Sequence, residues 1–193
     1  MAGRTTGRAL AVGALATVLV GTTGGPATAA PPTVSTLRSA GVILTDPDPA
    51  GAGAFVTFDV FAPPGEHAFG VGEVFVPGYE CLADERAPAT ITGLRAATST
   101  GTVPLTCGSE TAPPEGIPGQ AVVELTWSGE GTVQRSTTVD RDRRCVTRTG
   151  TRQARVAGSV HVTVPALEVD VTVSAPADGA AIREERSICL RPA

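Results

Sequence analysis

Seven arginines between residues 135 and 155 are the side chains of this sequence best suited to binding an anion. They are Arg135, Arg141, Arg143, Arg144, Arg148, Arg152 and Arg155, with Asp140 and Asp142 among them. Guanidinium groups bind phosphate and carboxylate with two parallel hydrogen bonds. One interpretation is a surface that binds an anionic envelope polymer or another exported protein. The other is a set of solvated arginines that pair with acidic residues elsewhere in the chain.

A second candidate site combines His161 with Asp170. If Pro165-Ala166 forms a two-residue hairpin loop, His161 and Asp170 lie opposite each other on neighbouring strands. A carboxylate beside an imidazole orients the ring for general-base catalysis, so a secreted hydrolase centred on this pair is the alternative function. The competing interpretation is an ordinary cross-strand pair on the surface. The sequence has no G-x-S-x-G nucleophile motif.

Other polar patterns are weaker candidates. Asp46-Pro47-Asp48 has alternating carboxylates but lacks the later ligands of a calcium loop, and a turn explains it better. Glu73 and Glu124 form a conceivable glycosidase pair, yet few aromatic side chains are available to stack on a sugar. We therefore expect no metal, no cofactor and no assigned catalytic residue. Nucleic acid is also not expected, because the protein is acidic and its arginine cluster contains no aromatic residues.

The four cysteines indicate two structural disulfides. They are Cys81, Cys107, Cys145 and Cys189, which allow three connectivities, and none has the short spacing of a zinc site. We favour Cys81–Cys107 and Cys145–Cys189, because a meander brings cysteines that are near in sequence onto neighbouring strands.

The first 29 residues have the features of a secretory signal peptide. Arg4 and Arg8 precede an apolar run over residues 9–20, and Ala27-Thr28-Ala29 fits the cleavage site. We expect a secreted chain of residues 30–193 that forms one domain and has no membrane span after cleavage. Residues 30–40 are expected to be a loose leader.

Charge is distributed unevenly along the exported chain. Two of the 15 basic residues lie in the signal peptide, so 13 arginines remain against 19 acidic residues, a net charge of −6. Residues 31–134 contain 3 arginines and 12 acids, whereas residues 135–193 contain 10 arginines and 7 acids. The second half is therefore the part that would attract an anion.

Alternating apolar and polar residues predict the elements that position these groups. The alternation is most regular over residues 120–173, and it is typical of antiparallel strands with one buried face. In this pattern Trp127 is in phase with Val123 and Leu125, so we expect it in the core. About nine short strands separated by Gly and Pro turns predict an all-β, antiparallel two-sheet β-sandwich, Ig-like or jelly-roll-like, with a closed β-barrel as the alternative.

Two segments carry a resemblance to known sequences. The run from Val123 to Gly131 contains W-S-G-E-G after an alternating strand, and the run from Arg152 to Val160 contains Arg-x-Ala-x-x-x-Gly. This pattern resembles uncharacterised exported all-β proteins of high-GC bacteria, over about residues 55–164, although the four cysteines depart from it. The resemblance implies export and an all-β fold, and it implies no activity.

Overall fold

The structure is a computed structural model that describes residues 31–45, 53–110, 112–175 and 179–190. The predicted signal peptide and Asp46-Pro47-Asp48 lie outside the described residues. Within them the chain forms eleven strands and one short 3-10 turn, with no α-helix. The strands are all paired antiparallel, so the prediction of an all-β antiparallel fold is confirmed.

The strands pair in a ring. They are β1 (Thr33–Thr45), β2 (Phe55–Ala62), β3 (Phe69–Val76), β4 (Tyr79–Ala83), β5 (Ala87–Thr92), β6 (Ala96–Gly108), β7 (Ile117–Gly129), β8 (Gln134–Asp140), β9 (Cys145–Val164), β10 (Val169–Ser174) and β11 (Ala181–Cys189). The order β9-β11-β1-β2-β3-β4-β6-β7 returns to β9, and the other three strands pair outside this ring. The sequence predicted two separate sheets. The observed pairing instead joins all eleven strands into one sheet, because long strands change partners along their length.

Strand β9 is the clearest case of such a change. Its first part, Cys145 to Gln153, pairs with β11 on one edge and with β8 on the other. Its second part, which ends at Val164, pairs with β10 on the edge that β11 occupies and with β7 on the edge that β8 occupies. Because β8 follows β7 and β11 follows β10, this 20-residue strand connects two regions of the sheet.

Two local predictions are corrected by the structure. Residues 33–40 are not a loose leader, because Thr33 to Gly41 pairs along β11. The hairpin after Val164 is longer than two residues, because Pro165–Leu167 forms the 3-10 turn and Glu168 adopts a left-handed conformation.

The core lies on the inward faces of the long strands. Val156, Val160 and Val162 are buried, and Trp127 is fully buried, as the alternation predicted. The indole Nε1 of Trp127 donates a hydrogen bond of 3.2 Å to the carbonyl of Gly41 on β1. This bond satisfies a buried donor and links β7 to β1, which are not neighbours in the sheet.

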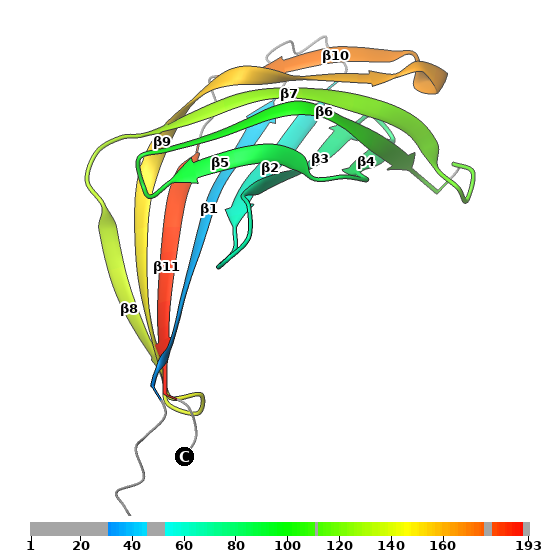
Figure 1. Ribbon diagram of the computed structural model, residues 1–193. Coiled ribbons are helices and arrows are strands. Elements are labelled where there is room, and N and C mark those ends of the chain that lie inside the picture. The colour runs from blue at the N-terminus through cyan, green and yellow to red at the C-terminus, as the bar shows by residue number, and fades with distance from the viewer. Residues whose placement is uncertain (1–30, 46–52, 111, 176–178, 191–193) are drawn as a thin grey trace, which may run out of the picture.

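One part of the sheet projects from the rest. The strand β8, the first part of β9, β11 and the start of β1 extend together away from the body (Figure 1). We call this four-stranded part the arm: residues 134–140, 145–153, 181–189 and 33–38. Of these residues only Ile182 is buried, so both faces of the arm are accessible to solvent.

Candidate functional site: the arginine face of the arm

The turn at the end of the arm is organised by Asp140. Its Oδ1 accepts hydrogen bonds from the backbone N–H groups of Asp142 and Arg143, at 3.1 and 3.0 Å. Its Oδ2 lies 3.7 Å from Nε of Arg143, and the next residue, Arg144, has a φ of 51°. The turn therefore exposes Arg141, Arg143 and Arg144 at the tip of the arm.

The register of the arm decides which side chains share a face. Residues directly opposite each other in an antiparallel ladder point to the same side of the sheet, and successive residues alternate. Arg148 on β9 pairs with Arg186 on β11, and Arg135 on β8 pairs with Gly150, one same-face row closer to the body. These three arginines, which we call the arginine face, therefore project from one side of the arm.

The arginine face has no local neutralisation. Arg135, Arg148 and Arg186 are exposed, and none of them has an ion pair or side-chain hydrogen bond among the described residues. The one carboxylate nearby on this face, Glu184, binds Nε of Arg38 at 2.6 Å. Like charges directly opposite each other destabilise a strand pair, so the pairing of Arg148 with Arg186 works against the stability of the arm.

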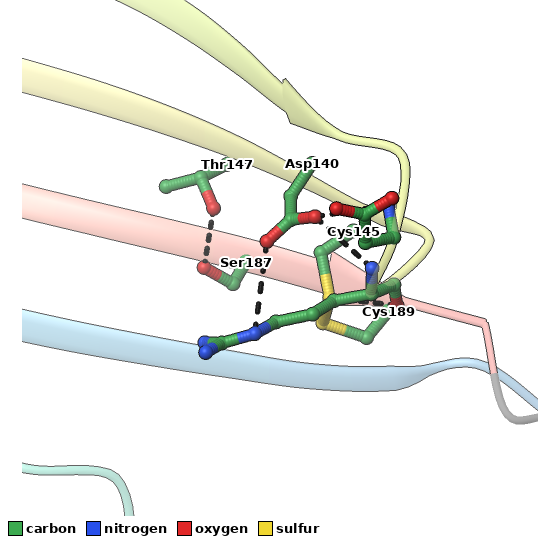
Figure 2. Close-up of polar contacts among 7 residues, drawn as sticks. Asp140, Cys145, Thr147, Ser187 and Cys189 are labelled. Carbon is green, nitrogen blue, oxygen red and sulfur yellow. Dashed lines mark hydrogen bonds and ion pairs between the residues drawn. A yellow bond between two sulfur atoms is a disulfide. The ribbon is translucent and has the colours of Figure 1, made fainter.

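The opposite face of the arm is rich in hydroxyl groups. Thr138, Thr147, Ser187 and Ser35 form one row across all four strands. Figure 2 shows Thr147 bonded to Ser187, at 2.8 Å, on the same side as Asp140 and the disulfide between Cys145 and Cys189. The arm therefore presents two chemically different surfaces.

The structure divides the predicted cluster of seven arginines. Arg135 and Arg148 belong to the arginine face, and the three turn arginines lie at its tip. Arg152 lies on the same side but donates from Nε to the carbonyl of Gly131 at 3.2 Å. Arg155 lies beyond the arm and forms an ion pair of 3.1 Å with Glu130. Arg186 was missed by the sequence analysis, because only the pairing of β9 with β11 brings it beside Arg148.

Both predicted disulfides are present. Cys81 and Cys107 are fully buried and join β4 to β6. Cys145 and Cys189 join β9 to β11 at the end of the arm. The bridges indicate an oxidising compartment, as expected for a protein outside the cytosol.

The pair formed by His161 and Asp170 exists, but its register differs from the prediction. His161 lies opposite Thr172 and Asp170 opposite Thr163, so the two meet diagonally, with Nε2 and Oδ1 separated by 3.4 Å. Thr172 Oγ1 lies 2.9 Å from the other ring nitrogen. The side chains are 41% and 74% exposed, which gives neither the enclosed surroundings nor the nucleophile that a hydrolase site requires.

The remaining candidates gain no support. Glu73 and Glu124 lie on β3 and β7, which are not neighbours in the sheet. Among the described residues no group of three or more His, Cys, Asp or Glu side chains is placed to hold a metal ion.

Comparisons with models of protein families, with curated proteins and with solved structures find no match. In the part of the chain that the structure covers, none of the helical segments has the length and apolarity needed to cross a membrane.

Proposed function

We propose that this chain is an exported, non-catalytic all-β protein that binds an anionic partner outside the cell through the arginine face. In this proposal the continuous sheet folds over so that its layers pack as in a β-sandwich, and the arm extends from that body. The observation that carries this proposal is the cross-strand pair of Arg148 and Arg186, with Arg135 diagonal to Arg148 and, among the described residues, no acidic partner for any of the three.

The turn of the arm supplies a second argument. Arg144 adopts a left-handed backbone conformation that is costly for a residue with a side chain and free of cost for glycine. Together with the facing arginines, the arm thus contains two features that oppose its own stability. Such local conflicts concentrate at functional sites, where the side chain serves binding rather than folding.

Arginine suits this role because its planar guanidinium forms two parallel hydrogen bonds with a phosphate or carboxylate. An anion between Arg148 and Arg186 would relieve their repulsion and accept hydrogen bonds from both. The acidic first half of the chain would be repelled by the same partner, which favours contact through the arm alone.

Co-sedimentation of the purified, oxidised protein with cell-envelope fractions over a series of salt concentrations tests this proposal. Binding should weaken as salt rises, and R148Q/R186Q should reduce it by about tenfold or more, since a hydrogen bond to a charged group contributes about 1.5–3 kcal/mol. Arg183 on β11 pairs with Thr151 and so lies on the opposite face of the arm from Arg186. The variant R155Q/R183Q therefore removes the same charge from outside the arginine face and should bind like the wild type. Equal losses in the two double variants would reject the arginine face as the site.

A further inference from the structure

The arginine face continues into an aliphatic row near the end of the arm, which is exposed at its two edges and half-buried in its middle. Val139, Val146, Ile188 and Val34 pair in this order across all four strands, on the same side as Arg148 and Arg186. Val139 is 60% exposed and Val34 is 50% exposed. Four β-branched aliphatic side chains in one row are unusual on an open sheet, because burial of such a row normally stabilises the fold.

The distance between the two rows is fixed by strand geometry. Successive residues on one face of a strand are about 7 Å apart, so the aliphatic row lies about 7 Å from Arg148 and Arg186, towards the tip. Leu190, directly after β11, adds a further apolar side chain that is 58% exposed. The aliphatic row therefore lies between two cationic groups, the turn arginines at the tip and the arginine face on the side nearer the body.

An apolar row with cationic side chains on both sides suits the surface of an anionic membrane. Interfacial protein segments bury apolar side chains about 5–10 Å deep, while long cationic side chains remain at the level of the lipid phosphates. A soluble anionic polymer would engage the arginines but would leave the aliphatic row exposed to water. The two rows together therefore favour a lipid surface.

The charge distribution also favours one orientation of the protein at an anionic surface. Residues 31–134, which form most of the body, contain 12 acidic residues and 3 arginines, whereas the arm and its turn contain most of the remaining arginines. An anionic surface attracts the arm and repels the body, so the protein would approach with the arm towards the surface.

We propose that the partner of the arginine face is a membrane surface containing anionic phospholipids, against which the arm lies with this face so that its aliphatic row inserts. This inference rests on the proposed function, because the same three arginines bind the phosphate groups. Val34 and Val139 then enter the outer part of the acyl region, and Arg148 and Arg186 lie among the headgroups.

Flotation of the oxidised protein with vesicles tests the proposal. One set of vesicles contains phosphatidylglycerol and phosphatidylcholine, and the other contains phosphatidylcholine alone. Binding should require phosphatidylglycerol. Because one arginine near an anionic surface contributes about fivefold in affinity, R148Q/R186Q should bind about thirtyfold more weakly. V34T/V139T, which keeps side-chain shape and strand propensity, should lose about tenfold.

Two control variants test whether a loss of vesicle binding is specific to the aliphatic row and the arginine face. I43T/V71T makes the same kind of change at exposed aliphatic positions of the body, on the opposite face of the sheet, and should bind like the wild type. R155Q/R183Q should retain nearly all of the binding.

Three other outcomes would contradict one or both proposals. Full vesicle binding by V34T/V139T would reject insertion of the aliphatic row. Salt-sensitive binding to envelope fractions without binding to vesicles would identify a polymer as the partner, so this inference would fail while the proposed function would stand. Absence of both kinds of binding would reject both.

Discussion

Arg148 on β9 and Arg186 on β11 lie directly opposite each other, on the same face of the arm, and neither has an ionic partner among the described residues. Both strands are held in register at this end by the disulfide between Cys145 and Cys189. The fold thus fixes two like charges side by side. In the proposed function, a bound anion would relieve the repulsion between these two charges.

Replacing Arg186 by Glu should stabilise the protein while it abolishes partner binding. The change converts a repulsive cross-strand pair into an attractive one, and such pairs differ by about 0.5–1 kcal/mol. Urea unfolding should show a higher midpoint with an unchanged slope. The control R183E removes an existing ion pair with Glu185 on the other face and should lower the midpoint slightly. A destabilised R186E protein would mean that the two arginines do not repel each other in the native state.

Arg144→Gly should also stabilise the native state, because glycine adopts the observed φ of 51° without steric cost. The expected gain is about 1 kcal/mol in the free energy of unfolding. Arg141→Gly, in the same turn but without a positive φ, should give no gain. If both variants have the same stability, the turn carries no backbone strain at Arg144.

The two disulfides should contribute to different parts of the molecule. C145S/C189S should loosen the arm, so amide hydrogens of β8 and β11 should exchange faster while those of β7 and β2 stay protected. C81A/C107A removes a bridge from the core that closes a loop of 26 residues, and it should lower global stability by about 3.5 kcal/mol in the chain-entropy model. Hydrogen exchange read by mass spectrometry separates the two cases. Uniformly faster exchange in C145S/C189S would show that the arm is not an independent unit.

Asp59 should make stability decrease as pH rises above about 4. Partial burial, and secondarily the nearby Glu73 carboxylate, raise the pKa of Asp59 above its ordinary value of 3.8. The native state therefore holds this proton more tightly than the unfolded chain, so the stabilisation is complete below the ordinary pKa and is lost as pH passes the raised one. Urea midpoints of D59N, measured from pH 3.5 upwards in parallel with the wild type, should lack this decrease. An unchanged pH dependence in D59N would assign it to other groups, and E73Q should give an intermediate result.

The alternation of apolar residues was sufficient to predict an all-β antiparallel fold and the buried Trp127, and the sequence proximity of the cysteines was sufficient to predict the disulfide connectivity. The alternation was not sufficient for register. The two-residue hairpin predicted at Pro165-Ala166 is lengthened by the 3-10 turn, which shifts β10 against β9 by two residues. A shift of two preserves the face of every side chain, so His161 and Asp170 still meet, but diagonally.

The candidate site was predicted only in part, because strand pairing and register could not be predicted from the sequence. The cluster of arginines from 135 to 155 is visible in the sequence, but its division between the turn, the arginine face and the ion pair of Arg155 depends on strand pairing. Arg186 lies 38 residues after Arg148 in the sequence, and Val34 belongs to a segment predicted to be a loose leader. Only the pairing of both chain ends along β11 and β9 brings these residues together.

The most direct test of the central claim is the slope of log binding against log salt concentration, for envelope fractions and the oxidised protein. Each arginine that displaces a counterion adds to this slope, so R135Q/R148Q/R186Q should bind more weakly at low salt and show a clearly shallower slope than the wild type. R155Q/R183Q should retain the wild-type slope. A triple variant with the affinity and the slope of the wild type would contradict the account, because the arginine face would then contribute nothing to binding.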